Sequence, residues 1–70
     1  MKIILRIFPG NRRGSFSSKE INIEKVNPTV KDIFDVCNDI DRKSSVSRGI
    51  TYLKEHEKLI EGEILNIIPA

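Results

Sequence analysis

Residues 29–42 read TVKDIFDVCNDIDR, and their apolar side chains recur at intervals of three or four. This spacing gathers them on one stripe of an amphipathic helix. Thr29 is a good N-cap, and Asp32 three residues later forms a capping-box-like pair near the positive end of the helix dipole. Arg42 and Lys43 fall where cations favour a helix C-terminus. We therefore predict a helix from Thr29 to Arg42. Its apolar stripe consists of Val30, Ile33, Phe34, Cys37 and Ile40.

Two strand patterns precede this helix. In Lys2–Phe8, Ile3, Leu5 and Ile7 share one face, and Lys2, Ile4, Arg6 and Phe8 share the other. Residues 9–14, PGNRRG, concentrate turn residues and predict a hairpin loop. Ser15–Glu24 resumes an alternating pattern through Ile21 and Ile23. Phe16 has the opposite parity to those isoleucines, and a bulge between Ser17 and Lys19 would turn it to their face.

Two further strands are predicted after the helix. Ser44–Ser47 is interpreted as a polar connector, and Gly49–Lys54 as a short strand centred on Ile50-Thr51-Tyr52-Leu53. Residues 54–58, KEHEK, predict a charged turn or a short helical piece. Ile64–Ile68 is a last strand, ended by Pro69.

The order strand, strand, helix, strand, strand predicts an α+β fold. One amphipathic helix must bury its stripe against one face of a small sheet. We expect a single β-grasp domain over residues 1–70, with a mixed four- or five-stranded sheet. In that arrangement the first and last strands run parallel at the centre of the sheet.

Composition limits the function of this chain of 70 residues. Cys37 is the only cysteine and His56 the only histidine, so an internal disulfide and the usual zinc sites are excluded. No stretch approaches the roughly 20 apolar residues of a membrane span, and a lone cysteine without a signal peptide favours a reducing cytoplasm. No nucleophile–base pair or phosphate-binding glycine loop is present, so we expect neither an enzyme nor a cofactor.

Three segments resemble one protein family. Thr29-Val30-Lys31-Asp32-Ile33 resembles the "T-V-x-D-L" start of a helix, and Leu59-Ile60-Glu61-Gly62-Glu63 resembles an "L-x-D-G-D" turn. Residues 64–70, ILNIIPA, resemble a final strand "E-V-x-I-I-P-P". Together these motifs are similar to the sulfur-carrier branch of the ubiquitin-like β-grasp proteins, the MoaD and ThiS type. The resemblance implies protein partners, among them an adenylating or synthase-type enzyme.

The same resemblance departs from the family at two places. The connection from Leu53 to Leu59 is shorter than the family's. Family members continue beyond the final prolines to a terminal Gly-Gly, whose carboxylate is adenylated and becomes a thiocarboxylate. This sequence stops at Ala70. A genuine sulfur carrier of molybdopterin or thiamine biosynthesis is therefore expected only if the natural gene product has a Gly-Gly tail that this chain lacks.

Single reactive residues are better explained by structure than by chemistry. Cys37 belongs to the apolar stripe and is interpreted as a core residue, and His56, between two glutamates, as a solvated turn residue. Asp35, Asp39 and Asp41 are interpreted as a solvated helix face, because no Gly-containing ligand loop accompanies them. The residues expected to face water are Lys31, Asp32, Asp35, Asn38, Asp39 and Asp41.

A basic patch for nucleic acid is one alternative function. It would consist of Arg12, Arg13, Arg42, Lys43 and Arg48, with Phe8, Phe16 and Tyr52 as aromatic candidates. The chain has 12 basic and 10 acidic residues. That balance favours a mixed-charge surface over a nucleic-acid-binding one.

The sheet face opposite the helix is the leading candidate for function. An apolar patch on a small charged domain often marks a partner site. We therefore expect a non-enzymatic ubiquitin-like protein that acts by protein–protein contact, with a homodimer through the same face as the alternative. The predicted contact residues are Ile4, Arg6, Phe8, Ile64 and Ile68.

Overall fold

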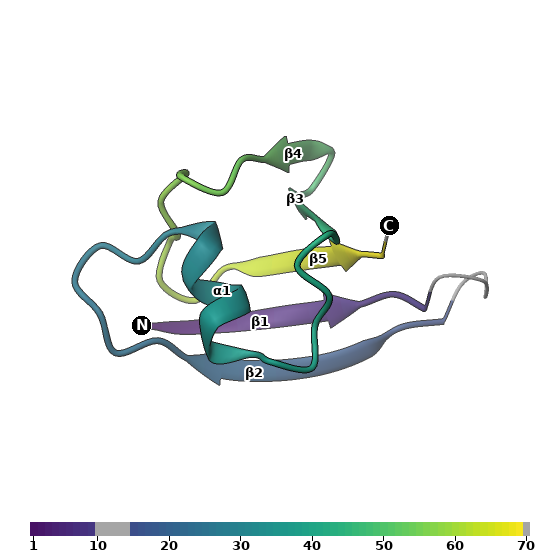
Figure 1. Cartoon of the computed structure of the whole chain (residues 1–70), viewed down its shortest axis with the longest axis horizontal. Helices are drawn as coiled ribbons and strands as arrows, with labels where there is room; N and C mark the ends of the chain where they lie inside the picture. Colours follow the sequence, from purple (N-terminus) through teal and green to yellow (C-terminus); the bar gives the residue numbers. More distant parts are fainter. Residues whose placement is uncertain (10–14, 70) are drawn as a thin grey trace.

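The first and last strands lie side by side and parallel in the middle of the sheet (Figure 1). This arrangement comes from a computed structural model that describes residues 1–9 and 15–69. Strand β1 spans Lys2–Ile7 and β5 spans Ile64–Ile68. Their register runs from Ile4 opposite Ile64 to Ile7 opposite Ile67. The central parallel pair predicted from the sequence is confirmed.

Three antiparallel strands complete the sheet. Strand β2, Ser17–Asn22, pairs with β1 on one side. On the other side β3, Ser45–Arg48, pairs with β5, and β4, Thr51–Leu53, pairs with β3. The order is β2-β1-β5-β3-β4, with helix α1 packed across one face (Figure 1). The predicted α+β, β-grasp-like class is therefore confirmed, with five strands in the sheet.

Helix α1 begins where predicted but ends early. It spans Val30–Val36, with Thr29 as N-cap, so the predicted end at Arg42 is wrong. The N–H of Cys37 still donates to the carbonyl of Ile33 at 2.8 Å, but Cys37 itself leaves the helical conformation at φ −107° and ψ 88°. In residues 38–41, NDID, the short Asn and Asp side chains can hydrogen-bond to nearby backbone groups in place of helical hydrogen bonds, which disfavours continuation of the helix.

The apolar period nevertheless continues past the helix. Ile40 is buried outside α1, and its N–H donates to the carbonyl of Cys37 at 3.3 Å in a turn. Ile40, the last residue of the predicted stripe, is therefore a core residue although it does not belong to the helix. Arg42 and Lys43 do not lie at the helix C-terminus, and Arg42 Nη2 instead reaches back to Asp35 Oδ1 at 2.6 Å.

The segment predicted to be a polar connector forms part of a strand. Ser45–Arg48 is β3, and its apparent polarity misled the prediction because its serines alternate with Val46, which is buried against the core. Gly49 and Ile50, predicted to lie in a strand, form the two-residue turn to β4. Gly49 has φ 62°, which suits the first central position of a tight hairpin turn.

Strand β2 carries no bulge between Ser17 and Lys19. Its pairing with β1 is continuous from Asn22 opposite Lys2 to Ser17 opposite Ile7. The expectation that Phe16 is turned to the isoleucine face is therefore wrong. By strand alternation Phe16 belongs to the face away from the helix, and it is 45% exposed.

The charged segment after β4 is a turn that covers the start of the helix. The N–H groups of Val30 and Lys31 donate to the carbonyls of Glu57 and Glu55, each at 3.0 Å. The first N–H groups of a helix have no partner within it, so these bonds satisfy two of them. The carbonyl of Pro28 accepts from Leu59 at 2.9 Å and joins the same two segments.

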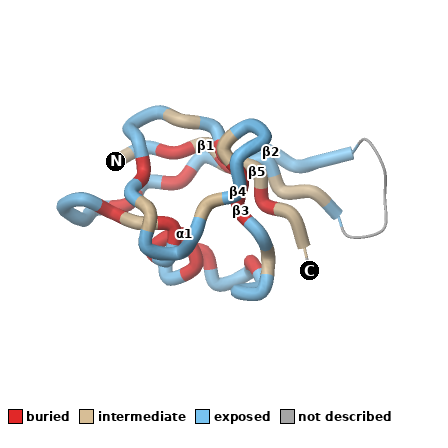
Figure 2. The backbone as a smooth tube through the Cα atoms, turned by 90° about the horizontal axis from the view of Figure 1, so that it is seen from above, coloured by how far each residue is buried: buried red, intermediate tan, exposed pale blue. Residues whose placement is uncertain are grey.

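The core lies between α1 and the sheet, where the buried residues of Figure 2 concentrate on the helix and on the central strands. Cys37 belongs to it, as predicted. The core residues are Ile3, Leu5, Ile21, Ile23, Val30, Ile33, Phe34, Cys37, Ile40, Val46, Leu59, Leu65 and Ile67.

Asp32 is buried, contrary to the expectation that it faces water. Its carboxylate accepts from the N–H of Thr29 at 2.8 Å and from Lys25 Nζ at 2.9 Å. The hydrogen bond from Lys25, followed by that from the Thr29 backbone, lowers the pKa of Asp32 below its ordinary value of 3.8. Asp32 is the third residue of the helix (N3), and its carboxylate caps the helix and ties it to the preceding loop.

Asp32 makes the stability of the fold sensitive to acid. A lowered folded-state pKa stabilises the protein above the ordinary pKa, about 4, and the contribution disappears as the pH falls through the lower folded value. We expect Asp32→Asn to cost about 1 kcal/mol at neutral pH, and the deficit to shrink below about pH 4. Urea unfolding across this pH range measures it. The exposed Glu24→Gln is the control, and a deficit for Asp32→Asn that does not change with pH would contradict the assignment.

Neighbouring residues of β5 should differ sharply in their effect on stability. Leu65 is fully buried on the helix side, whereas Ile64 is 44% exposed on the other face. Leu65→Ala should cost about 2–5 kcal/mol, because it leaves a cavity, and Ile64→Ala less than about 1 kcal/mol. Urea denaturation midpoints compare the two variants, and equal losses would show that the faces are assigned wrongly.

Candidate interaction surface

The sheet face opposite α1 brings together the residues predicted to contact a partner. We call it the open face. In the β1–β5 register, Ile4 lies beside Ile64 and Arg6 beside Asn66. The N–H of Phe8 extends this ladder by donating to the carbonyl of Ile67 at 3.0 Å, and Phe8 and Ile68 line one groove. The structure therefore places Ile4, Arg6, Phe8, Ile64 and Ile68 on a single surface.

A groove of about 510 Å³ occupies part of the open face. Its polar lining comes from Ser47 and Asn66, which are joined by a hydrogen bond from Asn66 Nδ2 to Ser47 Oγ at 3.2 Å. Ile50 is 99% exposed and Tyr52 63% exposed, so the apolar lining is accessible to another molecule. The lining residues are Phe8, Ser47, Gly49, Ile50, Tyr52, Asn66 and Ile68.

An aromatic pair borders this groove on the β2 side. The rings of Phe8 and Phe16 have centroids 5.3 Å apart and are tilted by 42°. The guanidinium carbon of Arg6 lies 5.4 Å from the Phe16 centroid, a cation–π distance. This packing holds Phe8, Phe16 and Arg6 in defined positions while Phe16 remains 45% exposed.

Two of the three described basic residues of the nucleic-acid alternative, Arg42 and Arg48, are engaged in ion pairs. Arg42 and Lys43 precede β3, whereas Arg48 ends it. Arg42 is paired with Asp35, and Arg48 donates to both carboxylate oxygens of Glu63, at 2.6 and 3.0 Å. The Glu63 carboxylate raises the pKa of Arg48. Arg12 and Arg13 lie outside the described residues.

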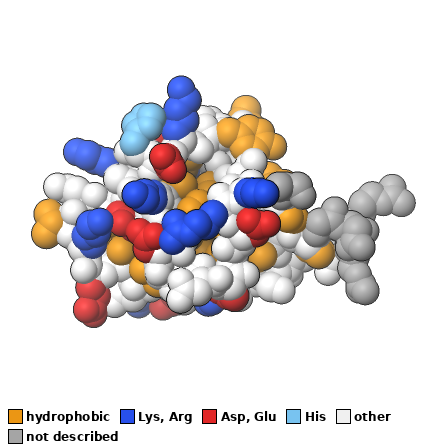
Figure 3. Space-filling model, in the orientation of Figure 1, with side chains coloured by type: hydrophobic (Ala, Val, Ile, Leu, Met, Phe, Trp, Pro, Cys, Tyr) orange, Lys and Arg blue, Asp and Glu red, His pale blue; other side chains and the backbone are white. Residues whose placement is uncertain are grey.

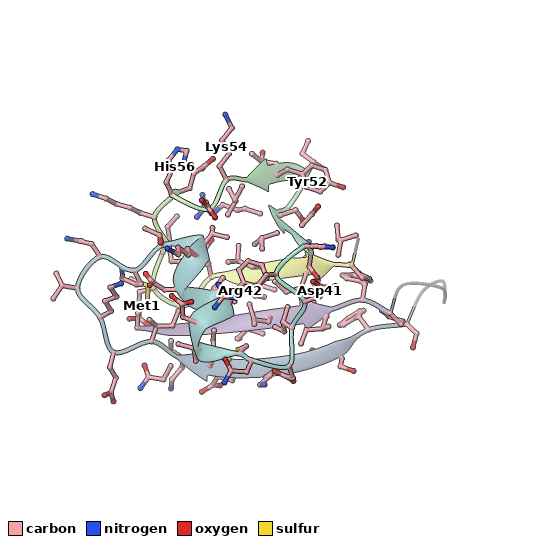
Figure 4. The ribbon with its side chains drawn as sticks, viewed as in Figure 1. Met1, Asp41, Arg42, Tyr52, Lys54 and His56 are labelled. Carbon is pink, nitrogen blue, oxygen red and sulfur yellow. The ribbon has the colours of Figure 1, made fainter. Side chains whose placement is uncertain are left out.

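The helix side of the molecule has no uniform charge either. Acidic and basic side chains are interspersed over it, with Arg42 among them (Figures 3 and 4). The one histidine, His56, is exposed and projects outward with Lys54 from the turn after β4 (Figure 4). A mixed-charge surface of this kind agrees with the overall balance of charge in the sequence.

The three aspartates near α1 act separately. Asp35 pairs with Arg42, Asp39 with Lys19 at 3.3 Å, and Asp41 accepts from the N–H of Lys43 at 2.9 Å. Within residues 1–9 and 15–69, no group of three or more potential metal ligands comes together. Burial raises the pKa of the Cys37 thiol, which keeps it in its unreactive protonated form.

Comparison with known proteins leaves the family unassigned. No family model, curated protein or solved structure matches the chain. Over the part of the chain that the structure describes, no helix is long and apolar enough to cross a membrane. The evidence for function therefore comes from the open face itself.

Several residues of the open face were not among the predicted contacts. Ser47, Ile50 and Tyr52 come from the β3–β4 hairpin, which the sequence interpretation placed in a connector and a single strand. The alternation of Ser45, Val46 and Ser47 is the signal that could have found them, because one buried residue between two serines suits a strand with one apolar face. Asn66 could have been found from the parity of Ile64 and Ile68.

Arg48 should matter for stability rather than for nucleic-acid binding. Arg48→Met leaves the mostly buried Glu63 carboxylate without its guanidinium and should cost about 2 kcal/mol. Retention on heparin should be weak and change little in this variant. A large loss of retention without a loss of stability, measured by salt elution and urea unfolding, would revive the nucleic-acid hypothesis.

Proposed function

We propose that this chain is a non-enzymatic, ubiquitin-like protein that works by binding another protein through its open face. The observation that carries the proposal is the accessible groove between Phe8, Ile68, Tyr52 and Ile50. Apolar side chains exposed together on a small charged domain favour contact with a partner. The β-grasp-like fold and the resemblance of three short motifs to carrier proteins of the MoaD and ThiS type support the proposal, because such carriers also act through protein contacts.

The fold supports this proposal by leaving one sheet face uncovered. Helix α1 has seven residues and packs on the other face, so it covers only the core side of the sheet. Ile64, Tyr52 and Ile50 contribute nothing to that core and keep 44%, 63% and 99% of their surface exposed. Burial in the core does not account for these apolar side chains, whereas contact with a partner would.

Photo-crosslinking in cells of the source organism tests the proposal. A photoreactive phenylalanine analogue placed at Tyr52 should give a discrete adduct with another protein. The same analogue at Val26, which is 85% exposed in the loop before α1, is the control and should not. Adducts common to both positions would contradict the proposal, and an adduct with the mass of two copies of this chain would assign the face to self-association.

Phe8→Asp should abolish the Tyr52 adduct while the protein stays folded. The aspartate would place a charge beside the groove and remove the ring that packs on Phe16. Circular dichroism checks the fold, and loss of folding would mean that Phe8 belongs to the core. Ile68→Ser, which changes the neighbouring apolar lining on β5, then provides a second test of the groove.

A further inference from the structure

We propose that the open face recognises an acidic segment of its partner, with a carboxylate on Arg6 and a large apolar side chain in the adjoining groove. This inference rests on the proposed function and adds the chemistry of the partner. It follows from the distribution of charge over the sheet, from the state of Arg6 and from the position of Arg6 next to the groove.

The strands are depleted of acidic residues. Glu20 is the only acidic residue in the five strands, although the chain contains ten. It already pairs with Lys2 at 3.6 Å. The other nine acidic residues lie in the helix, the loops and the turns. Lys2 and Arg6 are the two charged residues on the open-face positions of β1, β5, β3 and β4, and among the described side chains only Lys2 is paired. An acidic ligand would complement Arg6.

Arg6 is held in place but keeps its donors available. Its guanidinium carbon lies 5.4 Å from the Phe16 centroid, and no carboxylate among the described side chains forms an ion pair with it. Contact with an aromatic ring leaves guanidinium N–H groups free to bind a carboxylate, often in a two-bond arrangement. Its neighbours in the sheet register are Ser18 and Asn66, which are polar and uncharged.

The same register places Arg6 next to the groove, so the binding positions for the partner's carboxylate and for its apolar side chain lie close together. Asn66 lies opposite Arg6 on β5 and also lines the groove. Adjacent strands are about 4.8 Å apart, so an acidic residue on Arg6 would lie within a few residues of a side chain in the groove. Asn66 can also offer hydrogen bonds to the backbone of a segment that crosses it.

A second copy of this chain fits the face less well. Two open faces in a symmetric contact would bring two Arg6 side chains toward each other, with no acidic strand residue except the already paired Glu20 to balance them.

A nucleic acid also fits the face less well, because its phosphate backbone would not use the exposed apolar side chains of the groove. The acidic, apolar segment satisfies both features at once.

A random peptide library displayed on phage, selected against the immobilised protein, tests the inference. We expect the enriched peptides to carry Asp or Glu within a few positions of a large apolar residue. Arg6→Gln should weaken a synthetic enriched peptide by about tenfold, and added salt should weaken it further. Lys2→Gln removes a cation of the same strand that is already paired, so it should leave the affinity unchanged.

Each other outcome has a defined meaning. Neutral or basic peptides that still depend on Tyr52 would overturn the acidic partner and keep the proposed function. Peptides that bind Tyr52→Ser and Phe8→Asp variants unchanged, or a selection without enrichment, would overturn both. A dimer in sedimentation that Tyr52→Ser dissociates would assign the face to a second copy, and retention on heparin that depends on Arg6 but not on Tyr52 would assign it to a polyanion.

Discussion

The parallel pairing of β1 with β5 is the constraint on which the rest of the structure depends. It joins segments about sixty residues apart, a separation that makes loop closure costly in entropy. Hydrogen bonds at the start of the pair hold it: the carbonyl of Glu63 accepts from Ile4 at 3.0 Å, and that of Lys2 from Gly62 at 2.7 Å. Gly62 can donate there because its φ of 78° suits a tight turn. Because β1 and β5 are parallel neighbours, the segments between them in the chain must carry it back to the edge of the sheet where β1 begins.

That return explains why the molecule has one covered and one open face. The short α1 crosses the sheet and is capped by the 54–58 turn, which brings Leu59 into the core and leads to β5. The chain has no second helix in its described residues to cover the other side. Alternation along β1 and β5 then sends Leu5 and Leu65 to the core and Ile4 and Ile64 to the open face. The candidate site is thus a consequence of the same pairing that builds the fold.

The sequence predicted most of the architecture and part of the candidate site. The alternation in Lys2–Phe8 and Ile64–Ile68 and the cap at Thr29 are local signals. Each led to the correct element, and the two strands have faces with distinct burial. The length of α1 could not be predicted, because Ile40 keeps the helical period while its backbone forms a turn. Strand β3 was missed, because one apolar residue between two serines is a weak local signal and pairing with β5 and β4 is what makes the segment a strand.

By itself the sequence determined which side chains share a face, because strand alternation and helical period are properties of the local backbone. It determined the core residues of β1 and of the helical stripe and the parity of Ile4, Arg6 and Phe8, but not the burial of Val46. Tertiary structure alone decided that Tyr52, Ser47 and Asn66 meet Phe8 at one groove, and that Arg48 is tied to Glu63 while Arg6 has no such carboxylate among the described residues. These outcomes depend on strand order and register, and strand order and register are set by contacts between residues far apart in the chain.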